Sequence, residues 1–166
     1  MISKIYGLLL RQFGRLPVPV RHRIVGFTSP AYRVGTAAIL LSDDGDLLLA
    51  RHTYRNGWGL PGGMIGWKEE PLDTIIREVR EEIGIAVAQA GEPHIEHARD
   101  SRRIEWFFDL QLDGSTIDDV KINSPEIEEL RWFPLDALPL LEKKSPSTIR
   151  ALETVAERHF PGRLSR

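Results

Sequence analysis

The pattern of apolar and polar residues in the first half of the chain predicts two buried strands. Val34–Leu41 is a short run rich in valine, isoleucine and alanine, as expected of a buried strand. Ser42–Asp46 is rich in turn-forming residues, and Leu47–Arg51 fits a returning strand. The pattern therefore predicts that the two strands pair as a hairpin.

Three further strands are predicted in the second half of the chain, at His94–Arg99, Arg103–Leu112 and Ile127–Phe133. The middle one has the clearest pattern, because every second residue from Ile104 to Leu112 is apolar. Such alternation is typical of a strand with one face towards the core.

Two helices have recognisable boundaries. Pro71–Ile83 begins with a proline suited to the first helical position and is followed by Gly84, which suits the left-handed residue past the end. Ser145-Pro146 resembles a cap and first position for a helix reaching about His159. Near the start, residues 2–14 fit a short helix, and the two prolines in Leu16–Val20 indicate a turn or extended linker. Strands and helices mixed in this order favour an α+β fold, an α/β/α sandwich with a mixed β-sheet between helices.

Composition narrows the classes of protein and site. A chain of 166 residues fits one domain better than two. It has no cysteine, which excludes disulfides and thiolate metal sites. The net charge of -2 gives no reason to expect nucleic-acid binding. The apolar run Ile5–Leu10 is too short for a membrane span and lacks the features of a signal peptide, so we expect a cytoplasmic protein.

Charge is unevenly distributed along the chain. Residues 1–35 contain no Asp or Glu. They contain six cationic residues: Lys4, Arg11, Arg15, Arg21, Arg23 and Arg33. We therefore divide the chain into a basic extension, residues 1–32, and a main domain, residues 33–166. The extension is expected to pack on the domain or to form a homodimer contact; a membrane-surface helix and a disordered arm are the less favoured alternatives.

The helix at Pro71–Ile83 has two faces. Four apolar residues fall within a sector of about 60° and are predicted to face the core: Leu72, Ile76, Val79 and Ile83. Three glutamates share another face at i, i+3 and i+4: Glu78, Glu81 and Glu82. Like charges at this spacing repel each other, and they stand near the helix C-terminus, where the macrodipole favours cations.

A bound divalent cation would remove both penalties. Carboxylate oxygens are hard ligands and favour Mg²⁺, with Mn²⁺ as a substitute. Gly62 and Gly63, before the helix, let bare backbone approach a phosphate or offer a carbonyl to a metal ion. The alternative interpretation is a solvated acidic helix face.

The segment Gly63–Ile85 resembles the Nudix box of the Nudix hydrolase family. Its positions are filled here by Gly63, Glu69, Arg77, Glu78, Val79, Glu81, Glu82, Gly84 and Ile85. Trp58–Gly63 and Glu126–Phe133 resemble two further family segments, and the likeness covers about residues 33–140. Two departures leave the ligands intact: Ile75-Ile76 replaces small residues, and Trp67-Lys68 replaces the usual glycine or small polar residues.

The resemblance implies hydrolysis of a nucleoside diphosphate linked to another group. By similarity, Glu78, Glu81, Glu82 and the Gly62 carbonyl hold Mg²⁺, with Glu81 and Glu82 also in the catalytic set. Glu69 and Arg77 form a supporting pair. The general base is a box glutamate or an acid on a later loop, for which Glu126 is the best candidate and Glu129 a weaker one.

Substrate recognition is less clearly indicated. A basic and aromatic stretch before the glycine loop is a candidate substrate contact together with Gly63: Arg51, His52, Tyr54, Arg55 and Trp58. The alternative is an ordinary loop with Trp58 packed inward. Arg99, Arg102 and Arg103 either line the opposite wall or solvate a turn. A small nucleotide substrate is expected, although the family also allows a non-catalytic nucleotide sensor or an isomerase. ADP-ribose hydrolases of this family usually have a proline at a set distance beyond the box. Pro93 is too close to the box to match that position.

Overall fold

The computed structural model describes residues 2–54, 56–98, 101–112, 119–139, 141 and 146–159. The chain forms two compact units, Met1–Tyr32 and Arg33–Arg166. The first contains two helices, α1 (Ile2–Arg15) and α2 (Val18–Thr28). The predicted first helix is confirmed. The linker predicted at Leu16–Val20 is largely wrong, because its second proline stands in the first turn of α2, where no backbone N–H is needed.

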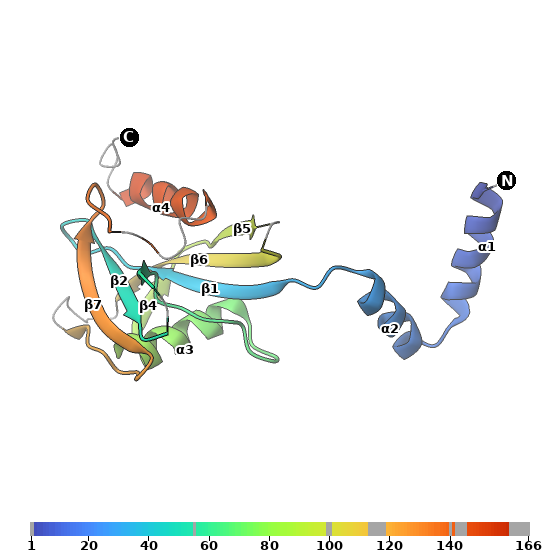
Figure 1. The fold of residues 1–166 in the computed structure, drawn as a ribbon, viewed down its shortest axis with the longest axis horizontal. Helices are drawn as coiled ribbons and strands as arrows, with labels where there is room; N and C mark the ends of the chain where they lie inside the picture. Colours follow the sequence, from blue (N-terminus) through green and yellow to red (C-terminus); the bar gives the residue numbers. More distant parts are fainter. Residues whose placement is uncertain are drawn as a thin grey trace. The chain divides into compact units, whose positions relative to one another are not determined.

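The second unit contains two sheets (Figure 1). In the larger one, β1 (Arg33–Ile39) runs parallel to β6 (Arg103–Leu112). Strands β4 (Val87–Ala90) and β5 (His94–Ala98) pair with β6 in the antiparallel sense. The sequence pattern does not predict β4, which has only four residues.

The smaller sheet is antiparallel and surrounds β2 (Asp46–His52). On one side β2 pairs with the two-residue strand β3 (Trp58–Gly59), and on the other with β7 (Ile127–Pro134). The predicted hairpin forms only beside its turn, where the Ser42 and Leu48 amides donate to the Asp46 and Leu40 carbonyls. Beyond the turn the prediction is wrong, because β1 and β2 lie in different sheets. A run that is buried throughout has no alternation, so its sequence does not reveal its pairing partner.

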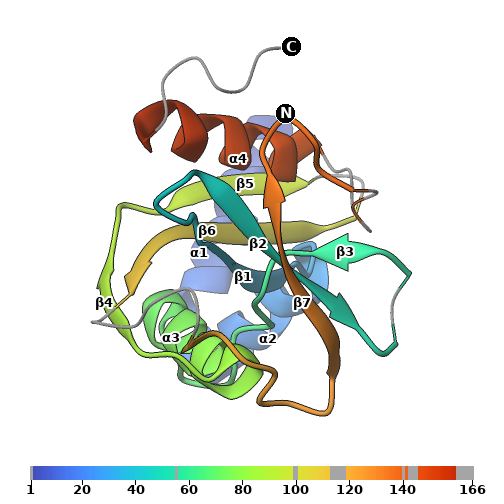
Figure 2. The same ribbon diagram turned by 90° about the vertical axis from the view of Figure 1, so that its left-hand side faces the viewer.

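Two helices cover opposite sides of the sheets, α3 (Pro71–Ile83) and α4 (Pro146–His159) (Figures 1 and 2). The core has a cluster under each helix. Under α4, the cluster includes Ile39, Leu47, Leu49, Phe107, Leu152 and Val155. Under α3, it includes Ala38, Leu40, Leu48, Ile75, Val79, Ile83 and Phe108. Successive residues of a strand thus serve opposite clusters, which explains why Ala37–Leu41 and Leu47–Ala50 are apolar without interruption. The predicted α+β sandwich is confirmed.

The ends of α3 agree with the prediction. Pro71 is at the start, and Gly84 adopts the left-handed conformation with φ 73° while its N–H donates to the Arg80 carbonyl. The core-facing side differs from the predicted one: Ile75 is fully buried, whereas Leu72 in the first turn is 41% exposed. The helix is rotated relative to the expectation, and this rotation also buries Glu82 to 5% exposure.

Among the residues that the structure describes, no helix combines the length and apolar character needed to cross a membrane.

Replacing Ile75 with alanine tests the packing of α3 against the sheet. Ile75→Ala is expected to lower the free energy of unfolding by about 2–5 kcal/mol, because the fully buried side chain leaves a cavity. Ile122→Ala removes an aliphatic side chain that is 48% exposed and should change it by less than about 0.5 kcal/mol. Urea unfolding measures both. Equal effects would contradict the described orientation of α3.

Candidate active site

A glycine-containing loop, residues 61–65, lies along the edge of β1. The β1 amides of Ala38 and Thr36 donate to the carbonyls of Pro61 and Gly63, both at 2.8 Å. Further along, the amide of Ile65 donates to the Val34 carbonyl at 3.1 Å. These backbone bonds hold the loop in place before any ligand binds.

Two glycines of this loop stand where a side chain has no room. Gly62 has φ 140°, and a Cβ there would lie 2.3 Å from the Thr36 carbonyl oxygen. A Cβ on Gly63 would lie 2.3 Å from Oε1 of Glu78. Gly62 is therefore required by its close approach to the β1 backbone. At Gly63 the neighbouring atoms are the end of a flexible side chain on α3, the motif helix, so a side chain there would displace the Glu78 carboxylate.

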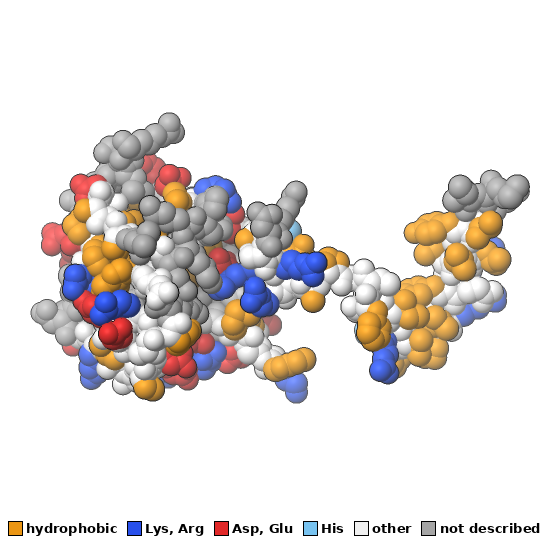
Figure 3. Space-filling model, viewed as in Figure 1, with side chains coloured by type: hydrophobic (Ala, Val, Ile, Leu, Met, Phe, Trp, Pro, Cys, Tyr) orange, Lys and Arg blue, Asp and Glu red, His pale blue; other side chains and the backbone are white. Residues whose placement is uncertain are grey.

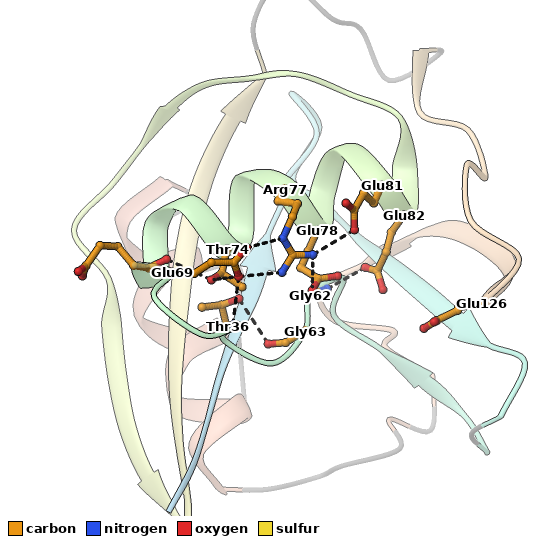
Figure 4. Close-up of polar contacts among 12 residues, drawn as sticks. Thr36, Gly62, Gly63, Glu69, Thr74, Arg77, Glu78, Glu81, Glu82 and Glu126 are labelled. Carbon is orange, nitrogen blue, oxygen red and sulfur yellow. Dashed lines mark hydrogen bonds and ion pairs between the residues drawn. The ribbon is translucent and has the colours of Figure 1, made fainter.

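Arg77 connects three carboxylates around one guanidinium group (Figure 4). Its Nε and Nη2 donate to the two oxygens of Glu69 at 2.9 and 3.0 Å, a bidentate pair. Its Nη1 donates to Glu78 and to Glu81, each at 3.0 Å. The predicted pairing of Glu69 with Arg77 is therefore present in the structure, and Arg77 also holds two of the predicted metal ligands.

Glu69 also fixes the turn before the helix. Its carboxylate accepts hydrogen bonds from the Gly66 amide and the Thr74 hydroxyl, both at 3.0 Å. The Arg77 side chain, followed by these two donors, lowers the pKa of Glu69 to about 2. The carboxylate is therefore ionised throughout the physiological range.

Glu82 is held differently from its two neighbours. Its Oε2 accepts a hydrogen bond from the Gly62 amide at 2.9 Å, and its Oε1 lies 3.3 Å from Nε2 of His52. His52 is 1% exposed, and its Nδ1 has no hydrogen-bond partner in the described part of the chain. A buried carboxylate thus joins the motif helix to the glycine loop and to the end of β2.

Glu78 lies half-buried between these groups. Burial raises the pKa of its carboxyl, and the charges of Glu82 and Glu81 raise it further, while Arg77 opposes the change. Glu78 therefore stands where an additional cation would favour the ionised form. In the described residues, no three acidic or histidine side chains are gathered into a ready metal-binding group. The carboxylates that a metal ion would use are instead held by Arg77, His52 and the Gly62 amide.

The later candidate acids lie beside this centre rather than within it. Glu126 immediately precedes β7, on the far side of Glu82 from Arg77 in Figure 4. Its carboxylate accepts a hydrogen bond from the Tyr54 hydroxyl at 3.4 Å, and its carbonyl accepts one from the Thr53 amide at 2.9 Å. Glu129 instead forms an ion pair with Arg51 at 2.9 Å.

A pocket opens next to the glycine loop. Its polar lining includes Arg103 and Glu105, whose side chains form an ion pair at 2.7 Å. Its apolar lining includes Trp58, Phe107 and Leu152. The pocket therefore combines flat apolar walls with one hydrogen-bonding pair, a combination suited to a small aromatic ligand.

The structure separates the predicted substrate residues. Gly63 and Trp58 line the pocket, and the Trp58 ring packs edge-on against Phe133 with centroids 4.8 Å apart. Arg51 lies 5.8 Å from the Trp58 ring but does not line the pocket, and Tyr54 is exposed beside Glu126. Two candidates, Arg55 and Arg99, fall outside the described residues.

Sequence reasoning missed part of this site. Glu105 appears in the sequence only as the polar member of an alternating strand, and Leu152 as an apolar residue of a helix. His52, a candidate substrate contact in the sequence, is instead 1% exposed beside Glu82. Its position has one usable signal, because it continues the alternation of Leu48 and Ala50 and so points to the same sheet face, towards α3.

The model of the NUDIX domain matches residues 31–155. This chain belongs to the Nudix hydrolase family. The predicted family, fold class and enzymatic character as a hydrolase of phosphoric anhydride bonds are thereby confirmed.

Relatives of the chain carry several names. An RNA pyrophosphohydrolase from Acidiphilium cryptum is 32% identical over 142 residues, covering 71% of this chain and 85% of the relative. A MutT Nudix hydrolase from Burkholderia pseudomallei has a solved structure with TM-score 0.61 and 30% identity, covering 76% and 99% of the two chains. For an ADP-ribose pyrophosphatase from Streptococcus suis, the TM-score is 0.59 and the identity 26%, with 75% and 92% covered.

Gly62→Ala tests the close approach of the loop to β1. The substitution is expected to lower the free energy of unfolding by about 2 kcal/mol or more, because alanine is strained at φ 140° and its Cβ overlaps β1. Gly59→Ala is the matched control, since a Cβ there meets nothing within 4 Å. Urea unfolding of both variants measures the difference. A Gly62→Ala protein as stable as Gly59→Ala would contradict the described loop.

The ion pair of Glu69 predicts a pH dependence of stability. Its pKa is about 2 in the folded chain against an ordinary 4.5, so its contribution is full above pH 4.5 and is lost as the pH falls towards 2. Thermal melting of the parent chain and of Glu69→Gln should therefore differ by a constant amount near neutral pH and converge in acid. A difference that grows below pH 4.5 would contradict this pairing.

Proposed function

We propose that this chain is a Mg²⁺-dependent pyrophosphohydrolase that cleaves a nucleoside diphosphate linked to another group. The observation that carries the proposal is the arrangement of the motif carboxylates beside the glycine loop and next to a pocket with aromatic walls. Relatives named for RNA and ADP-ribose pyrophosphohydrolysis support the reaction class. They differ in substrate, so the linked group is not inferred from them.

Glu78, Glu81, Glu82 and the Gly62 carbonyl are the residues proposed to hold Mg²⁺, with Mn²⁺ as a substitute. Their oxygen donors suit a hard cation. Burial, with the charges of Glu82 and Glu81, raises the pKa of Glu78, and a cation beside this carboxyl would oppose that change. When bound, the ion neutralises phosphate charge and lowers the pKa of coordinated water. Glu78 and Glu81, which accept hydrogen bonds from Arg77, would turn to hold the ion, and Glu69 would keep Arg77 in place through its bidentate contact.

The pocket beside the loop is proposed to receive the nucleoside. Trp58 offers an apolar surface to a base, and the Arg103–Glu105 pair offers both donors and acceptors to its edge. Gly63 brings its backbone close to the adjoining phosphate. Arg51 and Tyr54, which do not line the pocket, are proposed to contact the group on the other side of the diphosphate.

Proton transfer from the attacking water is assigned to Glu126. Its carboxylate is exposed and carries one hydrogen bond from Tyr54. Both oxygens of Glu82, by contrast, are engaged in the unliganded chain. Glu82 therefore serves mainly to hold the metal and to fix the loop, and Glu126 is available to accept a proton.

A substrate panel with Mg²⁺ tests the proposal. It contains ADP-ribose, dinucleoside polyphosphates, nucleotide sugars, CDP-alcohols, nucleoside triphosphates and 5′-triphosphorylated RNA. At least one member should be cleaved, and Glu82→Gln should lower kcat by about two orders of magnitude. Phosphate or pyrophosphate release, resolved by chromatography, measures turnover.

Two further variants complete the design. Glu153→Gln alters an exposed glutamate of α4 and should leave turnover unchanged. Glu126→Gln should lower kcat and remove the acidic limb of its pH profile while leaving metal affinity unchanged. No turnover of any panel member, or turnover that survives Glu82→Gln, would reject the enzymatic proposal in favour of a non-catalytic nucleotide sensor.

A further inference from the structure

The N-terminal unit, residues 1–32, carries apolar residues that it does not bury. In α1, Leu9 is 61% exposed and Tyr6 63% exposed, and in α2 Phe27 is 82% exposed. None of the residues of α2 is buried. Figure 3 shows hydrophobic side chains along both helices, with Lys and Arg among them. This unit thus presents a surface that water solvates poorly.

The residues of α1 are sorted into an apolar and a basic face. At about 100° per residue, five of the large apolar residues fall within a sector about 140° wide: Ile5, Tyr6, Leu9, Leu10 and Phe13. Leu8, which is 59% exposed, falls outside this sector and lies next to Arg15 around the helix. Arg11 and Arg15 stand close together on the opposite side of the helix. A helix that divides in this way into an apolar face and a cationic face is suited to lie in a membrane interface.

Charge reinforces this interpretation. Residues 1–32 contain five Lys and Arg residues and no Asp or Glu, while the whole chain has a net charge of -2. The potential of an anionic surface extends roughly 10 Å into physiological salt. A helix is about 10–12 Å across, so cations on the side away from the surface still lie near the edge of this potential. Each such cation strengthens binding to anionic lipid.

We propose that α1, assisted by the cations of α2, binds the surface of an anionic phospholipid bilayer without crossing it. The helix has 14 residues, which is too short to span a bilayer. An anionic bilayer satisfies both faces at once, since the apolar face enters the acyl boundary while the arginines meet headgroup charge. RNA would leave the apolar face in water, and self-association would bring like-charged helices together.

Vesicle flotation of the full chain tests this proposal. The chain should float with phosphatidylcholine vesicles containing roughly 30 mol % phosphatidylglycerol, and much less with phosphatidylcholine alone. Raising NaCl from about 0.1 M to about 0.5 M should weaken the binding. Leu9→Glu should reduce partitioning at least about tenfold, because it places a charge in the apolar face.

Two further variants separate the contributions. The double substitution Arg11→Gln, Arg15→Gln should reduce partitioning into anionic vesicles about 25-fold, or about fivefold for each cation. Ile122→Glu changes an exposed aliphatic residue outside this unit and should bind vesicles like the parent chain. Circular dichroism and the urea midpoint of each variant establish that the Arg33–Arg166 unit remains folded.

Several outcomes would overturn the proposal. Failure to float with anionic vesicles rejects it, as does equal binding by Leu9→Glu and Ile122→Glu. A dimer in light scattering that Leu9→Glu disrupts, without vesicle binding, assigns α1 to self-association. Retention of single-stranded RNA through Arg11 and Arg15, again without vesicle binding, assigns the surface to nucleic acid. If the parent chain does not float and Leu9→Glu is less stable than the parent, the apolar face of α1 packs against the chain's own Arg33–Arg166 unit.

Discussion

The site depends on the close contact between the glycine loop and the edge of β1. Backbone hydrogen bonds fix residues 61–65 along this strand, and the absence of a Cβ at Gly62 permits the approach. The Gly62 amide is then placed to donate to Glu82, so the same contact sets the distance between loop and motif helix. The placement of Glu82 against the loop follows from this spacing.

The second constraint is the balance of charge around Arg77. One guanidinium group holds Glu69 on one side and Glu78 and Glu81 on the other. Ion pairs near the surface contribute little to stability. Arg77 therefore holds the acidic side chains in place, but a metal ion could replace it as their partner at little cost. Burial of Glu82 against His52 contributes the less exchangeable part of the framework.

The two-sided core explains how distant parts of the chain reach one site. Alternate residues of β1 and β2 pack under α3 and under α4, so both helices are tied to the same strands. As a result, the α3 side carries the carboxylates, and the α4 side closes the neighbouring pocket through Leu152. A change in strand register would disturb both, because it would exchange the residues facing the two helices.

The sequence by itself determined the motif helix and its boundaries, the family and the carboxylate set, because these depend on residues near one another along the chain. Pro71, Gly84 and the spacing of Glu78, Glu81 and Glu82 act through local helical geometry. Tertiary structure decided the pairing of β1 with β6, the rotation of α3 that buries Ile75, and the meeting of His52 with Glu82. These depend on which surfaces come together in the core, and an unbroken apolar run carries no record of its partner.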